Sequence, residues 1–256
     1  MKRYSGVLLQ PDWTRAWHTP LLPVAQHVWQ AVNDLGSVHA ALNAQPCAAG
    51  VGFVPQSALP EGIAYEQFIY TTRQVPTRDN LHDYYNGLMW LHFPQTKQRL
   101  NALQFAELER MGGVQSTRGP VRDALTLFDE NVLLMQTSDA LWQALAWKRW
   151  DVVFGSLRSE WASTRLVLFG HAALEQLVQP FKGITAHVYR IPQGVENWDG
   201  WLAQHLAAEN LAAKPYTHLP VLGVPGWWQA NADASFYQDP QVFRALRKAP
   251  TAAVLG

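Results

Sequence analysis

The spacing of apolar residues predicts several amphipathic helices. Between residues 23 and 43, valine and leucine recur every three or four positions, which is the period of one helix face. A second helix is expected over residues 79–93. Pro94 suits the first turn of a third helix, which should run to about Met111 and stop at Gly112 and Gly113.

Shorter runs of β-branched and aromatic residues predict strands. These are expected at residues 63–72, 164–169 (a buried strand) and 184–190, with a β-hairpin joining residues 125–128 to 132–135 through an Asp-Glu-Asn turn. Further helices are expected from Ser138, as an N-cap, past Trp150, and over residues 171–178, 198–210 and 240–248.

Helices and short strands therefore alternate, without an internal repeat or a clear linker. This order predicts an α+β fold, with a mixed α/β arrangement as the alternative. The 256 residues are expected to form a single domain with helices around a small mixed sheet. In one version of this prediction, the helical part over about residues 1–60 is a peripheral extension.

Composition narrows the classes of partner. The chain has 20 basic and 20 acidic residues, so no overall field favours nucleic acid or an anionic membrane. No apolar run approaches the roughly 20 residues that a membrane-spanning helix needs. Cys47 is the single cysteine, which excludes an intramolecular disulfide and is expected to be structural. With no apolar signal core at the N-terminus, we expect a cytoplasmic protein.

Tryptophan is unusually frequent, with 12 in the chain. Most are expected to be core anchors, because they fall in otherwise apolar segments. Stacking platforms for a sugar or base ring are the alternative. The Pro- and Gly-rich loop over residues 219–228 contains Trp227 and Trp228, and its role is open.

The helix over residues 79–93 carries the densest polar cluster. On a helical wheel, the side opposite its core stripe bears the following residues: Asp79, His82, Asp83, Asn86, Trp90 and Phe93. An ordinary exposed face would carry Lys, Glu and Gln instead. Convergent polar groups beside aromatic walls are typical of a ligand pocket. The alternative is a capping Asp79 and a structural histidine.

Two further segments carry candidate chemistry. Arg118 and Arg122, which precedes Asp123, are able to clamp a phosphate or carboxylate, since guanidinium binds both in a bidentate manner. Asp129 and Glu130 suit a divalent cation or a general base. A plain turn and an ordinary ion pair are the competing interpretations, and we favour them slightly for these segments taken alone.

The sequence Phe-Gly170-His171 follows a predicted strand and opens a helix, a place where ligands gather in α/β sheets. His171 and Glu175 share a helix face at a spacing compatible with metal ligation. His187 lies on the next strand and is able to meet His171. Histidines held by backbone groups are the alternative. The common nucleotide-binding, serine-hydrolase and His-Glu-x-x-His templates are missing from the sequence.

Long motifs in the chain resemble a bacterial family known as domain of unknown function 3025. The segments that carry the resemblance are residues 76–97, 118–131, 168–175, 219–231 and 236–244. Asn131-Val departs from the Asn-Gly expected there. The resemblance implies no activity and no catalytic residue, but most of the polar residues named above fall inside its motifs.

Our leading hypothesis is a hydrolase-like enzyme that acts on a phosphate- or carboxylate-bearing small molecule, with metal assistance as an option. The expected catalytic residues are His82, Asp83, Asn86, Asp129, Glu130, His171 and His187, and the expected anion-binding residues are Lys97, Arg118 and Arg122. The alternative is a non-catalytic binding or interaction protein, in which these groups form a buried network and the Trp227 loop contacts a partner. The oligomeric state is open.

Overall fold

The computed structural model describes residues 8–113 and 119–246, and its fold is α+β. The helices are α1 (Val24–Leu35), α2 (Val38–Asn43), α3 (Tyr65–Thr72), α4 (Leu81–His92), α5 (Pro94–Arg110), α6 (Pro120–Asn131), α7 (Asp139–Ala146), α8 (His171–Gln176), α9 (Trp198–His205) and α10 (Ala208–Ala212). The strands are β1 (Gly52–Pro55), β2 (Gln74–Thr77), β3 (Val132–Gln136), β4 (Arg165–Leu168), β5 (Thr185–Arg190) and β6 (Tyr216–Pro220).

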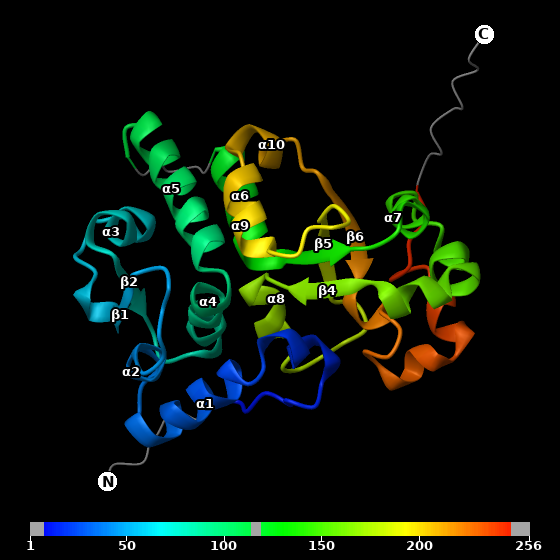
Figure 1. The fold of residues 1–256 in the computed structure, drawn as a ribbon, viewed down its shortest axis with the longest axis horizontal. Coiled ribbons are helices and arrows are strands. Elements are labelled where there is room, and N and C mark those ends of the chain that lie inside the picture. The colour runs from blue at the N-terminus through cyan, green and yellow to red at the C-terminus, as the bar shows by residue number, and fades with distance from the viewer. Residues whose placement is uncertain (1–7, 114–118, 247–256) are drawn as a thin grey trace.

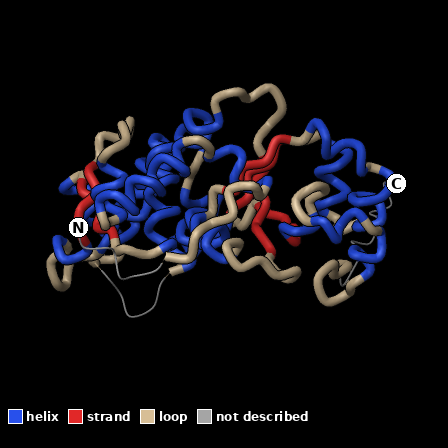
Figure 2. The backbone as a smooth tube through the Cα atoms, turned by 90° about the horizontal axis from the view of Figure 1, so that it is seen from below, coloured by secondary structure: helices blue, strands red, loops and turns tan. Residues whose placement is uncertain are grey.

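The strands form two separate small sheets. One is mixed and four-stranded, in the order β4-β3-β5-β6, with β3 antiparallel to β4 and parallel to β5. The other pairs β1 with β2 in parallel. Every residue of β3 is buried, as expected for a central strand. Figure 2 shows the two groups of strands apart, with helices between them.

Helix α4 lies between the two sheets and against α8 (Figure 1). Residues 83–90 of α4 are all buried, so the helix is covered on nearly every side. Gly87 makes the close packing against α2 feasible, because a Cβ there would collide with Leu42. Trp17 and Leu42 belong to the same hydrophobic core as the central sheet, so the first 60 residues contribute to that core.

Two strand predictions are wrong. Residues 65–72 form α3, and the residues that it buries, Phe68 and Ile69, are adjacent in sequence, which an alternating strand does not allow. Residues 125–131 belong to α6 and not to a hairpin, since Leu125 and Phe128 bury themselves at helical spacing. Aromatic and β-branched content misled both predictions, because β propensity depends strongly on context.

Several helix predictions have the right place and the wrong length. The first predicted helix is split into α1 and α2 at Gly36, which adopts φ 75°. The helix expected past Trp150 ends at Ala146, and a π-helical turn follows at Val152–Ser156. The segment over residues 198–210 is divided into α9 and α10. Residues 240–246 form turns and coil, where a helix was expected, and residues 247–248 lie outside the described part.

The remaining predictions are confirmed in outline. Helix α5 begins at Pro94, and Ser138 caps α7 by accepting a hydrogen bond from the Leu141 amide. β4 and β5 lie where strands were expected, although β4 is an edge strand that buries only Leu168. Among the described residues, no helix is both long and apolar enough to cross a membrane.

Candidate functional site

The start of α4 is fixed by a network around Asp83. Asn80, and not Asp79, is the N-cap, and its side chain accepts a hydrogen bond from the Asp83 amide at 2.7 Å. The Asp83 carboxylate in turn receives the Arg78 guanidinium at 3.1 and 2.8 Å and the Arg78 amide at 2.6 Å. Asp79 accepts from the Val38 amide at 2.8 Å. Asp83 is therefore a buried anchor for Arg78.

In the first turn of α4, His82 meets His171 from the first turn of α8. Their Nε2 atoms lie 3.0 Å apart, and the ring planes are inclined at 79°. Gly170 permits this approach, since a Cβ there would lie 2.5 Å from the Glu130 carbonyl oxygen and 2.6 Å from the Asn131 Cα. The Gly170 amide also donates to the Val132 carbonyl at 2.8 Å, which fixes α8 beside the end of α6.

A carboxylate faces the outer nitrogen of each imidazole. Nδ1 of His82 lies 3.0 Å from a carboxylate oxygen of Glu175, and Nδ1 of His171 lies 3.9 Å from a carboxylate oxygen of Asp129. The second distance is too long for a hydrogen bond, and Nδ1 of His171 is buried without a hydrogen-bond partner. Carboxylates behind two converging imidazoles are typical of the surroundings of a metal ion.

Behind the histidines, Lys97 joins a buried polar network. Its ammonium donates to both Asp129 oxygens at 2.6 and 2.8 Å and to the Asn86 side-chain oxygen at 2.8 Å. The Asn86 amide donates to the Tyr65 hydroxyl at 3.1 Å. The Lys97 side chain is only 5% exposed. All three of its donors are thus engaged, so Lys97 holds Asp129 in place instead of awaiting an anion.

The electrostatics of the site shift the pKa values of His171 and Asp129. Burial lowers the pKa of His171 to about 3, with Lys97 and His82 acting in the same sense and Asp129 opposing them. Burial alone raises the pKa of Asp129, but Lys97 and His171 outweigh it and hold that pKa below its ordinary value. His171 is therefore neutral and Asp129 is ionised, the forms needed for ligation and for orienting a ligand.

Three side chains form a group that could hold a cation. One ligand atom each from His82, Glu130 and His171 lie within 4.8 Å of one another. Two imidazoles and one glutamate are the protein ligands of many catalytic zinc sites, which leave another position for water or substrate. All three residues are among the candidates that the sequence named, although the sequence put Glu130 in a hairpin turn and the structure puts it on α6.

A cavity of about 570 Å³ opens in front of these ligands. The residues that line it are Gln56, Leu59, Tyr65, Glu66, Arg78, His82, Asp83, Asn86, Gln104, Thr126, Asp129, Glu130 and His171. Sequence reasoning missed Tyr65, Arg78 and Gln104 as lining residues. Arg78 stands at the head of the densest motif, so its position offered a signal, whereas Tyr65 was assigned to a strand.

The remaining predicted residues lie elsewhere. His187 pairs in register with Val132, but its ring lies 4.6 Å from that of His218 on β6, away from His171. Arg122 is buried on α6, with Nε unpartnered, and does not line the cavity. Asp123 is exposed. Arg118 lies outside the described residues.

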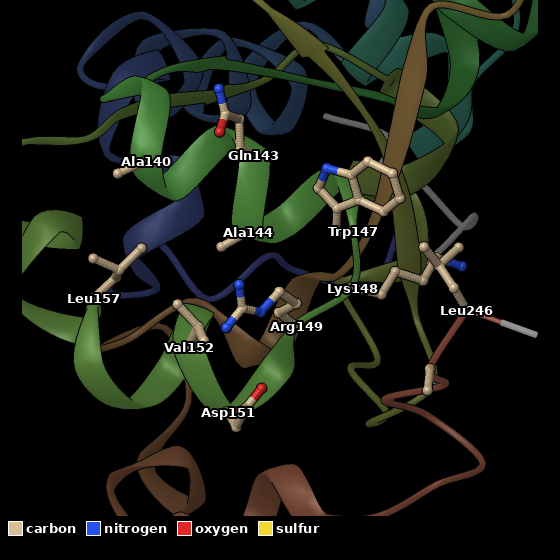
Figure 3. Close-up of a pocket in the computed structure, with 11 residues that line it drawn as sticks. Ala140, Gln143, Ala144, Trp147, Lys148, Arg149, Asp151, Val152, Leu157 and Leu246 are labelled. Atoms are coloured by element: carbon tan, nitrogen blue, oxygen red, sulfur yellow. The ribbon is translucent and has the colours of Figure 1, made fainter. Parts of the chain in front are cut away.

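A larger cavity, of about 730 Å³, lies between α7 and the segment that follows it (Figure 3). Among its described lining residues, Asp151 is the single carboxylate and there is no histidine. It therefore lacks the acid–base and ligand groups of the α4–α8 site. The Trp227 loop also lies apart from that site. The ring centroids of Trp227 and Trp17 are 6.2 Å apart, and the Arg15 guanidinium lies over the Trp228 ring.

Comparison with known proteins gives a family and no activity. Residues 51–247 match the family model described as "Protein of unknown function (DUF3025)", which confirms the resemblance seen in the sequence motifs. No curated protein and no solved structure matches the chain. The matched range contains every residue of the α4–α8 site described above.

Proposed function

We propose that this chain, which belongs to the DUF3025 family, is a metal-dependent hydrolase acting on a phosphate- or carboxylate-bearing substrate. In this proposal His82, Glu130 and His171 bind a divalent ion beside the 570 Å³ cavity, and the cavity holds the substrate. We also place the enzyme in the cytoplasm, on the sequence grounds given above.

The arrangement of protons on the two imidazoles carries this proposal. Glu175 accepts the Nδ1 proton of His82, which leaves a lone pair on His82 Nε2. If His171 donates its Nε2 proton to that lone pair, its own Nδ1 carries no proton. Two hydrogen-bond acceptors, Nδ1 and the Asp129 carboxylate, then face each other. A cation at both Nε2 atoms removes this conflict, because His171 then carries its proton on Nδ1, toward Asp129.

The charge of the cavity supports the same conclusion. Its described lining includes four carboxylates, Glu66, Asp83, Asp129 and Glu130, and one permanent cation, Arg78. Two of the carboxylates are neutralised, since Arg78 pairs with Asp83 and Lys97 with Asp129. Carboxylates thus outnumber permanent cations in the described lining, a composition that suits a bound divalent cation.

A divalent ion in such a site polarises the scissile group and makes hydroxide available near neutral pH. The protein's own residues position the reactants. Glu175 and Asp129 orient the two imidazoles. Arg78, 56% exposed, adds positive charge at the cavity for an anionic group. Burial raises the pKa of Tyr65, so its hydroxyl remains protonated beside Asn86.

A second candidate function is a non-catalytic binding protein with a structural polar network. The observation that favours it is the complete pairing of Lys97 with Asp129 and Asn86, which needs no ligand. This network explains the buried side of the site. It leaves unexplained why two imidazoles converge at the cavity and why Nδ1 of His171 has no partner, so we favour the hydrolase.

The test is hydrolysis of a panel of phosphate monoesters, phosphate diesters and carboxylate esters by the chelator-treated chain, with and without added Zn²⁺ or Mn²⁺. We expect turnover of at least one class that requires the ion and is lost in His171→Ala. His27→Ala is a matched control, since His27 is an exposed histidine on α1. Turnover that is equal in His171→Ala and wild type, or absent with every ester, would contradict the proposal.

A further inference from the structure

A third cavity, of about 530 Å³, lies at the edge of the four-stranded sheet beside β5 and β6. It shares no lining residue with the α4–α8 site. Its charged and polar lining residues are Lys148, Thr185, His218, Gln241 and Arg244, and its described lining contains no carboxylate. In a chain with equal numbers of acidic and basic residues, this is a local concentration of positive charge.

The two permanent cations of this cavity are Lys148 and Arg244. Within residues 8–113 and 119–246, no recorded ion pair includes Lys148 or Arg244. No carboxylate is among the described residues that line this cavity, although Lys148 also lines the 730 Å³ cavity, where Asp151 lies. In Figure 3 the Lys148 side chain points away from Arg149 and Asp151.

The local backbone fixes where both cations stand. Lys148 adopts φ 52°, a left-handed conformation that non-glycine residues rarely take, and its amide donates to the Leu145 carbonyl at the end of α7. The Trp150 indole donates to the Arg244 carbonyl at 2.9 Å. Nε of Arg244 donates to the Gln241 carbonyl at 2.8 Å. The two basic residues thus come from separate segments that Trp150 joins.

Two histidines of the sheet lie at this cavity or next to it. His187 and His218 are cross-strand partners on β5 and β6, with ring centroids 4.6 Å apart. Burial lowers the pKa of His187 to about 4, and His218 and Lys214 act in the same sense. Burial and Lys148 lower the pKa of His218. Nδ1 of His187 is buried without a hydrogen-bond partner. A bound anion beside His218 would favour the protonated form of that imidazole.

We propose that this cavity binds a multiply charged phosphate-type anion, such as a polyphosphate or a phosphorylated small molecule. Lys148 and Arg244 would neutralise its charge, and Thr185, Gln241 and His218 offer hydrogen bonds to its oxygens. A volume of about 530 Å³ is sufficient for a small ligand. Two cations favour a polyvalent anion over a single carboxylate, because each additional negative charge on the anion is attracted to both cations.

The test is calorimetric titration of the full, chelator-treated chain with inorganic pyrophosphate at low and at physiological salt. We expect saturable binding that weakens with salt and falls at least tenfold in Lys148→Gln and in Arg244→Gln. Arg73→Gln is the matched control, because Arg73 is also a cation with positive φ just after a helix, at the far small sheet. His171→Ala should bind pyrophosphate as the wild type does, which separates this cavity from the proposed metal site.

A histidine NMR titration supplies an independent readout that does not depend on substitutions. Pyrophosphate should shift the ring resonances of His187 and His218 and leave His27 unchanged. Two results would overturn the proposal. One is an equal loss of binding in Arg73→Gln, or binding that is no weaker in the two cavity variants. The other is the absence of any shift at His187 and His218 at saturating pyrophosphate.

Discussion

Ion pairs link charged groups at the α4–α8 site, whereas in the described part of the chain none includes Lys148 or Arg244 at the cavity beside β5 and β6. In the first region Lys97 pairs with Asp129, Arg78 with Asp83, and Glu175 with His82. In the second region, the described lining around Lys148 and Arg244 contains no carboxylate. Paired groups at fixed distances suit the orientation of metal ligands, and unpaired cations suit the capture of an anion. The contrast predicts different costs for similar substitutions.

The largest effect is expected on the stability of the paired region. Lys97→Met should lower the free energy of unfolding by about 3–5 kcal/mol, since it leaves the Asp129 carboxylate buried without its partner. Urea unfolding would measure this. The control is Asp139→Asn, which removes an exposed pair with Arg190 and should cost less than about 1 kcal/mol. If both variants lowered the free energy of unfolding equally, the buried Lys97–Asp129 pair would matter no more to stability than an exposed pair.

The next effect concerns activity and separates the two candidate functions. His82→Ala should reduce turnover about 100-fold or more, the scale on which acid–base and ligand groups act, and should leave the melting temperature equal or higher, as at functional sites. A purely structural His82 would instead cost about 1–3 kcal/mol of stability, because Glu175 and His171 lose a partner. Thermal melts and ester hydrolysis on the same preparation distinguish these outcomes.

A smaller change is expected when only the orienting carboxylate is altered. Glu175→Gln retains the shape of the side chain but loses the charge that holds the Nδ1 proton of His82. Zn²⁺ affinity should fall about 10–100-fold, the usual cost of removing such a partner. Competition with a chromogenic chelator measures the affinity. If Glu175→Gln bound Zn²⁺ as tightly as Glu196→Gln, a change at an exposed glutamate, Glu175 would have no positioning role.

The smallest effect concerns how the stability of the folded chain depends on pH, through His187 beside the β5–β6 cavity. The pKa of His187 is lowered to about 4 in the folded chain, from an ordinary 6.5. Between these values the unfolded chain binds a proton that the folded chain does not, so stability should fall as pH falls from 6.5 toward 4. His187→Gln should flatten this slope in urea-unfolding experiments. A slope identical to that of the wild type would show that His187 does not contribute.

The sequence predicted the α+β fold class and named several residues that line the α4–α8 cavity, although it misplaced some of the elements that carry them. The wheel of α4 placed His82 and Asn86 on the side away from the core stripe, and both line the cavity. This worked because helix periodicity is a local property. His171 was identified from the strand–glycine–helix order, which the close approach of Gly170 to α6 explains.

Long-range contacts account for most of what was missed. Whether Lys97 is free or paired depends on Asp129, 32 residues away, and no local pattern records that. His187 was expected to meet His171, but strand pairing places it against His218. The hairpin prediction failed because residues 125–131 belong to α6, so β3 pairs with the distant strands β4 and β5 instead.

The most direct test of the central claim is the stoichiometry of metal binding by the purified full chain. After chelator treatment, calorimetric titration with Zn²⁺ should show one high-affinity site in the wild type and in His27→Ala. The site should be lost in His171→Ala and strongly weakened in Glu130→Gln, provided that each variant keeps the wild-type circular dichroism spectrum. Absence of a stoichiometric site in the wild type, or the same site in His171→Ala, would contradict the metal centre.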